Sequence, residues 1–472
     1  MSDGAPGLSE APRRVSTLVT NGVVIAVDDE RRIFTDGAIA VDGATIVAVG
    51  RRPDVEAQYA ADKVIDAGGG VVQPGFVDGH NHLSQHLGRG TIPDLWPEER
   101  EHDQWLPYWT NMTEDDGRAS AMLACLEMVR NGTTTFCESG ARFGVELNAS
   151  VAGQVGLRGM VSQWCTDIAP HEAVAVGDAD ANLERLERQL AALPKSDDAL
   201  VWAGVGMSGM GKCSDTLLVE GKKLAERHGV PMDMHQSFGS GDTDAYREHA
   251  GGKLAVEHLE GLGILGSDLK LVHMIRTDIA EVPILARTGT NVTHCPGASL
   301  RVAMGVSRVG SFPEMVEQGV NITLGSDSGN YSDAFDIGKQ MYLAATIHRE
   351  ARGLMPTISA EQSLEMATIN GANSLGLGHL VGSIEPGKRA DIVIHEYRRP
   401  EWHAGMDPIN NLVYSAQSTG VDTVMVNGEV ILERGEFTRV DEEAEYREID
   451  RSARALYKRM GFEIQHRWKV VD

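Results

Sequence analysis

The sequence predicts an α/β protein in which a (β/α)8 barrel of the TIM type is joined to a small β-sandwich built from both chain ends. Short apolar segments alternate with amphipathic ones through the middle of the chain, and strand-like segments with turn signals flank this region on both sides. We therefore expect four parts: a flexible N-terminus over 1–15, a composite sandwich over 16–72 and 381–440, a barrel over 73–380, and a helical tail over 441–472.

The flanking regions consist of short strands. "TLVTNGVVIAVDD", "DGAIAVDGATIVAVG" and "DKVIDAGGGVVQPG" precede the predicted barrel, and "GKRADIVIHEY" and "VDTVMVNGEVIL" follow it. Alternation of apolar and polar residues is typical of half-buried strands. Asn427 and Gly428 fit the turn of a two-residue hairpin. The charged segment 441–460 has the pattern of a surface helix that packs on the rest of the protein.

The middle of the chain alternates strand and helix. Its apolar segments include "GTTTFCESG", "GLRGMVSQW", "LVWAGVGMS", "VPMDMHQS", "LKLVHMI", "TNVTHCP" and "VNITLGSDS", and amphipathic segments such as "SDTLLVEGKKLAERHG" separate them. About eight such units fit a closed barrel. In that architecture the polar residues at the C-terminal ends of the strands face a ligand.

Charge and composition exclude several kinds of partner. A formal net charge of -25 disfavours nucleic acid and anionic membranes, which would repel the surface. No segment reaches the roughly 18 apolar residues of a membrane helix, and "MSDGAPGLSEAPRR" lacks a signal core, so we expect a cytoplasmic protein. The 5 cysteines form no CxxC pair, which argues against a disulfide framework or a thiolate zinc site.

Polar residues at four strand ends predict a metal site. "GHNH" places His80 and His82 on one side of a strand, because side-chain direction alternates along it. "MDMH" ends in His235, "KLVH" in His273 and "LGSD" in Asp327, each after an apolar run. Buried ionisable groups need partners, and a metal ion supplies one for the imidazoles and the carboxylate together.

Longer motifs resemble a known family. "QPGFVDGHNHL", "THCPGASLRVAMGV", "LGSDSGN" and "ATINGANSLGLGHLVGSIEPGKRADIVI" resemble the metal-dependent amidohydrolase superfamily. The resemblance covers nearly the whole chain. It is to the branch that holds triazine hydrolases, cytosine- and guanine-type deaminases, and phenylurea and thiocarbamate (molinate) hydrolases.

The resemblance implies a role for each of the five residues. His80, His82 and His235 look like metal ligands, Asp327 like a ligand that also accepts the proton of the attacking water, and His273 like the residue that orients or deprotonates that water. A divalent ion held by imidazoles and a carboxylate lowers the pKa of bound water toward roughly 7. For His273 the alternative is a plain core histidine.

We expect one divalent ion per subunit. Binuclear relatives carry a bridging carboxylated lysine or glutamate at the end of the fourth strand, whereas "LVWAGVGMSGMG" has neither at its tip. Lys212, a few residues further on, keeps the binuclear alternative open. The ligand set favours zinc, with iron, cobalt or manganese as alternatives.

The chain departs from the pattern of the related deaminases at Phe238. Deaminases of this branch usually carry a glutamate three residues after the strand-five histidine, and a phenyl ring can neither carry a proton nor bond a ring nitrogen. With Met207 and Met210 it would make one wall of the pocket apolar. The alternative is that Asp242 or Glu257 supplies the acid.

A segment rich in aromatic residues follows the HxH strand. Trp96, Trp105, Tyr108 and Trp109 would form either a lid over an apolar substrate or a contact between subunits. We expect Phe238, Trp96, Met207 and His294 to bind substrate. We also expect a homo-oligomer, with no nucleic-acid or membrane partner.

These features predict an enzyme. The first hypothesis is a metal-dependent hydrolase that cleaves a non-peptide C–N or carbamate bond of a small apolar urea, amide or carbamate, of which phenylureas are examples. It rests on the absence of an acid at Phe238. The alternative is a deaminase or dehalogenase of a triazine, pyrimidine or purine ring. A catalytically inactive scaffold is disfavoured because all the metal ligands are present.

Overall fold

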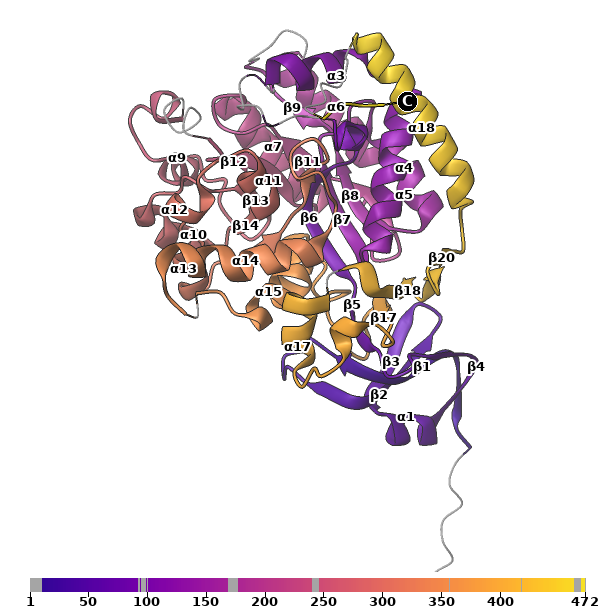
Figure 1. Cartoon of the computed structure of the whole chain (residues 1–472). Helices are drawn as coiled ribbons and strands as arrows, with labels where there is room; N and C mark the ends of the chain where they lie inside the picture. Colours follow the sequence, from indigo (N-terminus) through magenta and orange to yellow (C-terminus); the bar gives the residue numbers. More distant parts are fainter. Residues whose placement is uncertain are drawn as a thin grey trace, which may run out of the picture.

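Among the described residues, a nine-stranded mixed sheet joins the two ends of the chain (Figure 1). The computed structural model describes residues 11–91, 94, 99, 101–168, 177–239, 246–355, 357–416, 418–461 and 468–471. The sheet contains β1 (Arg13–Ile25), β2 (Ile33–Asp42), β3 (Thr45–Arg51), β4 (Tyr59–Asp66), β5 (Val71–Pro74), β17 (Ile392–His395), β18 (Val421–Val426), β19 (Glu429–Glu433) and β20 (Glu436–Phe437). Strand β5 pairs in parallel with β1 and antiparallel with β17, which connects the N-terminal strands to the C-terminal ones.

The two faces of this sheet pack into separate apolar clusters. On β2, Ile39 joins one cluster with Ile392 of β17, while its neighbour Ala38 joins the other. Helix α1 (Arg52–Gln58) covers the second cluster through Val55. Both chain ends thus contribute to one module, as the sequence predicts. Its described strands form one hydrogen-bonded sheet, however, so the division into a two-sheet sandwich stays a prediction.

The predicted hairpin in the C-terminal part of this sheet is confirmed. Val426 of β18 pairs with Glu429 of β19, which leaves Asn427 and Gly428 as the two turn residues. Both have positive φ angles, of 52° and 78°. A type I′ turn requires this conformation at both positions, and asparagine followed by glycine adopts it readily.

The remaining strands are parallel and form two sheets. They are β6 (Phe76–His82), β7 (Thr133–Ser139), β8 (Arg158–Ser162), β9 (Trp164–Cys165), β10 (Val201–Ala203), β11 (Val205–Met207), β12 (Met232–Gln236), β13 (Leu269–His273), β14 (Asn291–His294), β15 (Ile322–Leu324) and β16 (Asp327–Ser328). One sheet has the order β10-β8-β7-β6-β16 and the other β15-β14-β13-β12-β11-β9. The predicted α/β class is confirmed.

The two parallel sheets share three interrupted strands. Strands β8 and β9, β10 and β11, and β15 and β16 are each separated by one or two residues, and the members of each pair belong to different sheets. At Gly204, between β10 and β11, an added Cβ would lie 2.2 Å from the sulfur of Met160. A side chain at this position would have to displace that of Met160, which crosses the strand here. Closure into one continuous barrel stays a prediction.

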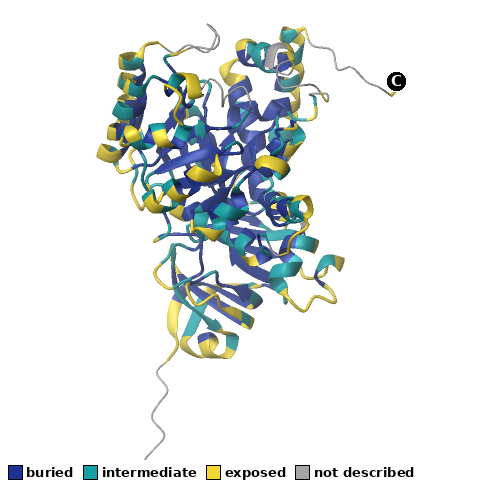
Figure 2. Ribbon diagram, turned by 90° about the vertical axis from the view of Figure 1, so that its left-hand side faces the viewer, coloured by how far each residue is buried: buried dark blue, intermediate teal, exposed yellow. Residues whose placement is uncertain are grey.

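Helices surround the parallel strands, which are the most deeply buried part of the protein (Figure 2). None of the described helices is long and apolar enough to span a membrane. The helices are α3 (Leu106–Asn111), α4 (Glu114–Arg130), α5 (Val145–Val155), α6 (Ala179–Ala192), α7 (Asp215–His228), α9 (Ala255–Gly261), α10 (Val282–Thr288), α11 (Pro296–Arg301), α12 (Val306–Val309), α13 (Phe312–Glu317), α14 (Ile337–Arg352), α15 (Ala360–Ala367), α16 (Ile369–Ser374), α17 (Pro408–Asn411) and α18 (Glu442–Met460).

Short helical turns complete the connections. They are η1 (Leu83–Gly88), η2 (Glu101–Trp105), η3 (Ile279–Glu281), η4 (Pro400–Trp402), η5 (Leu412–Ala416) and η6 (Ser418–Gly420). Turn η1 directly follows the HxH strand β6. It is buried along its whole length, because helix α4 packs against it.

Local sequence signals begin and end these helices. Thr113 and Asp116 form a reciprocal capping box at the start of α4. Ser214 caps α7, and Gly229 ends it in a left-handed conformation. Such caps satisfy the backbone groups that a helix leaves unpaired at its ends.

The C-terminal helix α18 packs along α4, as Figure 1 shows at the upper right. Arg118 of α4 makes a two-pronged ion pair with Glu445 of α18, with both distances at 3.1 Å. Asp116 of α4 accepts hydrogen bonds from Ser452 and Arg459. The hydroxyl of Tyr457 donates to a backbone carbonyl in η1 at 2.7 Å. This helix therefore supports the segment that follows the HxH strand.

A buried ion pair connects the parallel strands to the terminal sheet. The guanidinium of Arg158, the first residue of β8, donates to both carboxylate oxygens of Asp391, at 2.9 and 3.1 Å. Both side chains are 2% exposed. Asp391 also accepts from the backbone N–H of Asn427 at 2.7 Å. Two charges removed from water are tolerated here because each hydrogen-bonds the other.

We predict that Asp391→Asn lowers the free energy of unfolding by about 3–5 kcal/mol, because it leaves the buried Arg158 charge without its partner. Urea denaturation followed by circular dichroism measures this change. Asp36→Asn is the matched control, since Asp36 forms a similar two-pronged pair with Arg52 on the surface. Equal effects of the two substitutions would contradict the prediction.

Candidate metal centre

Four imidazoles and one carboxylate meet at the C-terminal ends of neighbouring parallel strands. Strand β6 supplies His80 and His82, β12 supplies His235, β13 supplies His273, and β16 supplies Asp327. The ring centroid of His80 lies 4.7 Å from that of His82, 4.8 Å from that of His235 and 5.7 Å from that of His273. Two overlapping groups of potential ligand atoms result: His80, His235 and His273, and His80, His82 and Asp327.

The donor atoms of this cluster fit a metal ion. The Nε2 atom of His80 is buried and has no hydrogen-bond partner in the described structure. The Nε2 atom of His82 lies 3.4 Å from Nε2 of His235 and 3.5 Å from a carboxylate oxygen of Asp327. Unpaired buried nitrogen atoms are unfavourable, and a divalent cation between them would bond to several at once.

Burial keeps the imidazoles in the form that binds metal. The pKa of His235 is lowered to about 3, chiefly by burial and further by the nearby His80. Burial likewise lowers the pKa of His82 and of His273 well below the usual value. These three rings are therefore neutral at pH 7, as metal ligation requires. Burial also raises the pKa of Asp327, to about 6, against the attraction of His80.

The backbone is strained at two of the five residues. His273 has a φ angle of 77° and Asp327 one of 64°, both in the left-handed region. Such conformations cost on the order of 1–3 kcal/mol each in residues with side chains, and they concentrate at ligand sites. The strained residues lie at the last position of β13 and at the first position of β16, where their side chains join the group.

Asp233 lies on β12, two residues before His235, and its side chain hydrogen-bonds the cluster. Its carboxylate accepts from Nδ1 of His80 at 3.1 Å and from the hydroxyl of Ser139. Lys270 of β13 approaches the other carboxylate oxygen at 3.0 Å, and both of these side chains are fully buried. Burial alone would raise the pKa of Asp233, but Lys270 and His80 lower it. The carboxylate therefore stays charged and fixes His80 with Nε2 free for an ion.

Sequence reasoning missed Asp233 and Lys270. The available signal was a charged residue inside an apolar strand, two or three positions before the ligand. "MDMH" and "LKLVH" both contain one. A charge at such a position needs a buried partner, and here each is the partner of the other.

The expected substrate-binding residues lie in different places. Phe238 lies beside the cluster, with its ring centroid 4.3 Å from that of His273. Met207 directs its side chain toward Gly221 of helix α7, although its backbone carbonyl accepts a hydrogen bond from His235. His294 stacks on Phe312 of α13 at 3.8 Å. Trp96 lies outside the described residues.

The other expected alternatives are also placed. Glu257 is exposed and caps helix α9 through the backbone N–H of Leu254, so it is not the acid of the cluster. Asp242 lies outside the described residues. Lys212 is exposed, and whether the centre holds one ion or two stays a prediction.

Three tryptophans form an aromatic wall next to the ligands. Trp105 and Trp109 stack with their centroids 5.4 Å apart, and each also contacts Trp164. Trp164 lies 5.1 Å from the ring of His82 and 5.8 Å from that of His235. The described part of the aromatic segment thus faces the cluster, as the lid hypothesis expects. Trp164 was not predicted as a site residue, because it ends an apolar strand without any polar signal.

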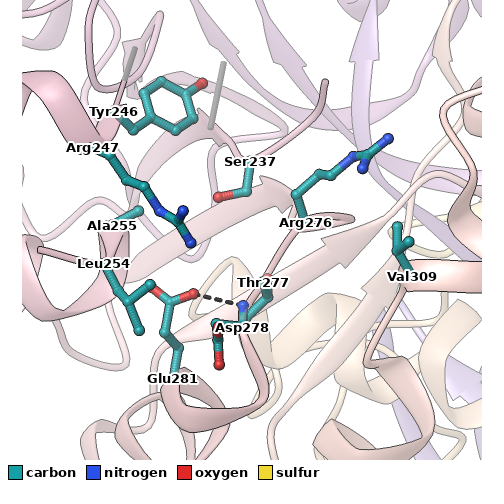
Figure 3. A pocket seen from close by; sticks show the side chains of 10 residues that line it. All are labelled: Ser237, Tyr246, Arg247, Leu254, Ala255, Arg276, Thr277, Asp278, Glu281 and Val309. Atoms are coloured by element: carbon teal, nitrogen blue, oxygen red, sulfur yellow. Dashed lines mark hydrogen bonds between the residues drawn. The ribbon is translucent and has the colours of Figure 1, made fainter. Parts of the chain in front are cut away.

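A separate cavity of about 210 Å³ lies beside Ser237, the residue that precedes Phe238 in the chain (Figure 3). Ser237, two residues after His235, is one of its lining residues. Arg247 extends into the cavity, and Arg276 points away from Arg247. Its acidic residue Glu281 accepts from the backbone N–H of Asp278 at 2.8 Å. None of the five clustered residues lines this cavity.

Parallel strands that end in a buried histidine and aspartate cluster define a metal-dependent hydrolase. Residues 71–431 match the Amidohydrolase family, and the chain belongs to that family. It is accordingly an enzyme, a hydrolase that acts on carbon–nitrogen bonds. The family generally binds a divalent metal.

Individual relatives match nearly the whole chain. A 5-methylthioadenosine/S-adenosylhomocysteine deaminase of Syntrophobacter fumaroxidans is 32% identical over 422 residues, which cover 89% of this chain and 93% of the relative. A 5'-deoxyadenosine deaminase of Methanosarcina acetivorans is 29% identical, with coverage of 94% and 98%. The crystal structure of an adenosine deaminase from Xanthomonas campestris with bound zinc superposes with a TM-score of 0.87 at 25% identity, covering 96% of this chain and 100% of that one.

These relatives contradict the first functional hypothesis. A urea, amide or carbamate hydrolase was expected from Phe238, whereas the matched proteins are named as deaminases of adenosine compounds. The alternative, hydrolysis at a nitrogen heterocycle, is the better supported one. The resemblance to the family is confirmed, but nothing supports a place in its phenylurea and thiocarbamate branch. The error was to treat one absent acid as decisive for the reaction.

We predict that Asp233→Asn weakens zinc binding by roughly 10–100-fold, because His80 loses the charged partner that orients it. Competition with a chromogenic chelator measures the affinity. The double variant Asp233→Asn/Lys270→Met removes the buried lysine charge that the single variant leaves unpaired, and should bind zinc as weakly.

Asp198→Asn is the control for this experiment, because Asp198 is an exposed carboxylate paired with Arg389 at 2.8 Å. It should bind zinc like the unaltered protein. Unchanged affinity in both Asp233 variants would show that the carboxylate is only a packing element.

Proposed function

We propose that this enzyme is a metal-dependent deaminase that replaces the exocyclic amino group of an adenosine-type nucleoside by oxygen and releases ammonia. The observation that carries the proposal is the pair of overlapping ligand groups, His80, His235 and His273, and His80, His82 and Asp327, in a chain that matches adenosine-compound deaminases over 89% and 94% of its length. We further infer that the two parallel sheets close as a (β/α)8 barrel, since β16 follows β15 and pairs with β6.

The ligand set suits one zinc ion per chain. His80, His82, His235 and Asp327 would hold it, because these donors combine neutral nitrogen with carboxylate oxygen. When bound, such an ion supplies a water molecule of lowered pKa and a positive charge opposite the developing negative charge. Iron, cobalt or manganese would suit the same donors.

Asp327 is the group best placed to move protons. Hydrolytic deamination adds water to the ring carbon, breaks the bond from that carbon to the amine, and leaves an oxo product and ammonia. Both protons must leave the water: one reaches the departing amine, and the other reaches the ring nitrogen beside the attacked carbon, which carries it in the oxo product. Asp327 is 5% exposed and lies within the ligand group, so it can accept a proton from the water and deliver it to the amine.

His273 completes the proton-handling side of the site. Its Nδ1 atom is buried without a hydrogen-bond partner in the described structure, and its ring stands 5.5 Å from that of His235. A neutral imidazole in this position would hydrogen-bond and orient the attacking water. Phe238, which packs against His273, contributes no proton and would instead cover the face of a flat substrate.

The aromatic side chains around the ligands suit a purine ring. Trp164 approaches the cluster from the side of His82, and Phe238 approaches from the side of His273. A planar heterocycle between such side chains gains stacking contacts worth about 0.5–1.5 kcal/mol per aromatic pair. Trp105 and Trp109 extend the wall beside Trp164, next to which an apolar substituent of the substrate would lie.

The test is ammonia release by the zinc-loaded enzyme from adenosine, 5'-methylthioadenosine and S-adenosylhomocysteine. We expect turnover of at least one of them, loss of turnover after chelation, and recovery on adding zinc. Asp327→Asn should lower kcat by about 10²-fold or more, because proton transfer is lost. Failure with all three nucleosides, together with dechlorination or deamination of a triazine, would overturn the nucleoside assignment.

Trp164→Leu should raise KM for the nucleoside roughly tenfold with little change in kcat, because stacking stabilises bound substrate and transition state alike. Steady-state kinetics separate the two constants. Trp468→Leu is the control, since Trp468 is 89% exposed. A fall in kcat at constant KM would show that Trp164 acts on the chemical step instead.

A further inference from the structure

A second group of potential metal ligands lies outside the candidate metal centre. Asp215 is the first residue of helix α7, His258 belongs to helix α9, and His249 ends the helical turn 246–249. Their ligand atoms all lie within 4.8 Å of one another. None of the three belongs to the five-residue cluster or lines the cavity beside it.

Both histidines direct the same atom at the same oxygen. The Nε2 atoms of His249 and His258 lie 3.0 and 2.9 Å from Oδ1 of Asp215. The two rings are nearly perpendicular, at 88°, so their Nε2 atoms approach this oxygen from different directions. Ordinary surface ion pairs join one base to one acid, whereas here two bases and one acid meet at a point.

The spacing fits a single tetrahedral ion. Two imidazoles bonded to one zinc at about 2.0–2.1 Å have ring centroids roughly 5 Å apart. The centroids of His249 and His258 are 5.6 Å apart. The rings of His82 and His235, in the main cluster, are separated by 5.4 Å.

The surroundings would allow an ion to enter and keep a water ligand. The side chains of His249, His258 and Asp215 are 20%, 14% and 44% exposed. Partial burial works to raise the pKa of Asp215, but the hydrogen bonds from His258 and His249 lower it. The carboxylate is thus charged near neutral pH, which is the form that binds a cation.

We propose that Asp215, His249 and His258 form a second divalent-metal site, of the zinc or cobalt type, with water as the fourth ligand. The ion would tie the turn 246–249 and helix α9 to the start of α7, at the point where His249 and His258 both contact Asp215. Tyr246, Arg247 and Leu254, which line the cavity of Figure 3, lie in or between the clamped segments. The ion would therefore hold one wall of that cavity in place.

The test counts metal in the purified full-length enzyme after dialysis against micromolar free zinc. We expect about two zinc ions per chain, and about one in each of the variants His249→Gln and His258→Gln. Glutamine keeps a hydrogen-bonding group at these partly exposed positions, so both variants should fold. Titration with cobalt gives an independent signal, since tetrahedral sites absorb visible light strongly.

His228→Gln is the matched control, because His228 also belongs to α7 and pairs with a single carboxylate, Glu187, at 3.0 Å. It should retain two ions, and His82→Gln should lose the ion of the main centre but keep this one. One zinc per chain in the unaltered enzyme would overturn the proposal. So would a second ion that persists in both the His249 and His258 variants, since it would then lie elsewhere.

These outcomes do not depend on the deaminase assignment. Both glutamine variants should keep the ammonia-releasing activity of the zinc-loaded enzyme, if that activity is found, because neither residue touches the main cluster. Zinc should also raise the melting temperature of the His82→Gln variant, and this increase should disappear when His258→Gln is added.

Discussion

The candidate metal centre depends on one buried charge pair. Asp233 and Lys270 lie on adjacent strands beneath the histidines, and neither has water to stabilise its charge. Each makes the other tolerable, and their arrangement gives His80 an anionic hydrogen-bond acceptor. With that ring fixed, its outer nitrogen faces His235 and His273 on neighbouring strands. The ion pair thus stabilises the register between β12 and β13, in addition to apolar packing. A shift of the register by one residue would separate Asp233 from Lys270.

The five clustered residues could be predicted from strand periodicity. The surroundings of the cluster could not, because they depend on packing that periodicity does not report. His80, His82, His235, His273 and Asp327 each end an apolar run, and parallel strands bring such ends together. The same rule failed to specify Met207, because the interruption at Gly204 breaks the strand that carries it and its side chain packs on helix α7. Trp164 was not predicted as a site residue, because a tryptophan after an apolar strand is typical of the hydrophobic core. The α/β class followed from alternation, whereas hydrogen bonding divides the described strands into two parallel sheets.

The identity of Phe238 alone does not determine the class of substrate. Its ring lies beside His273, and its role in binding substrate stays a prediction. The further step from an apolar side chain to an acyclic substrate was wrong, because the reaction class depends on the whole arrangement of ligands, proton carriers and walls. A phenyl ring next to the cluster is compatible with any flat substrate. Only the relatives, which match most of the chain, separated the two hypotheses.

The contact between α18 and η1 bears on when the parts of the metal centre can come together during synthesis of the chain. The HxH strand is among the first parts of the barrel region to be synthesised, but the helix that contacts the following turn, through Tyr457, lies nearly four hundred residues later. His235, His273 and Asp327 also arrive long after His80. A nascent chain on the ribosome therefore cannot complete its metal centre early, and exposed histidines must wait for distant partners. The complete set of five residues exists only after Asp327, the last of them in the chain, has been synthesised.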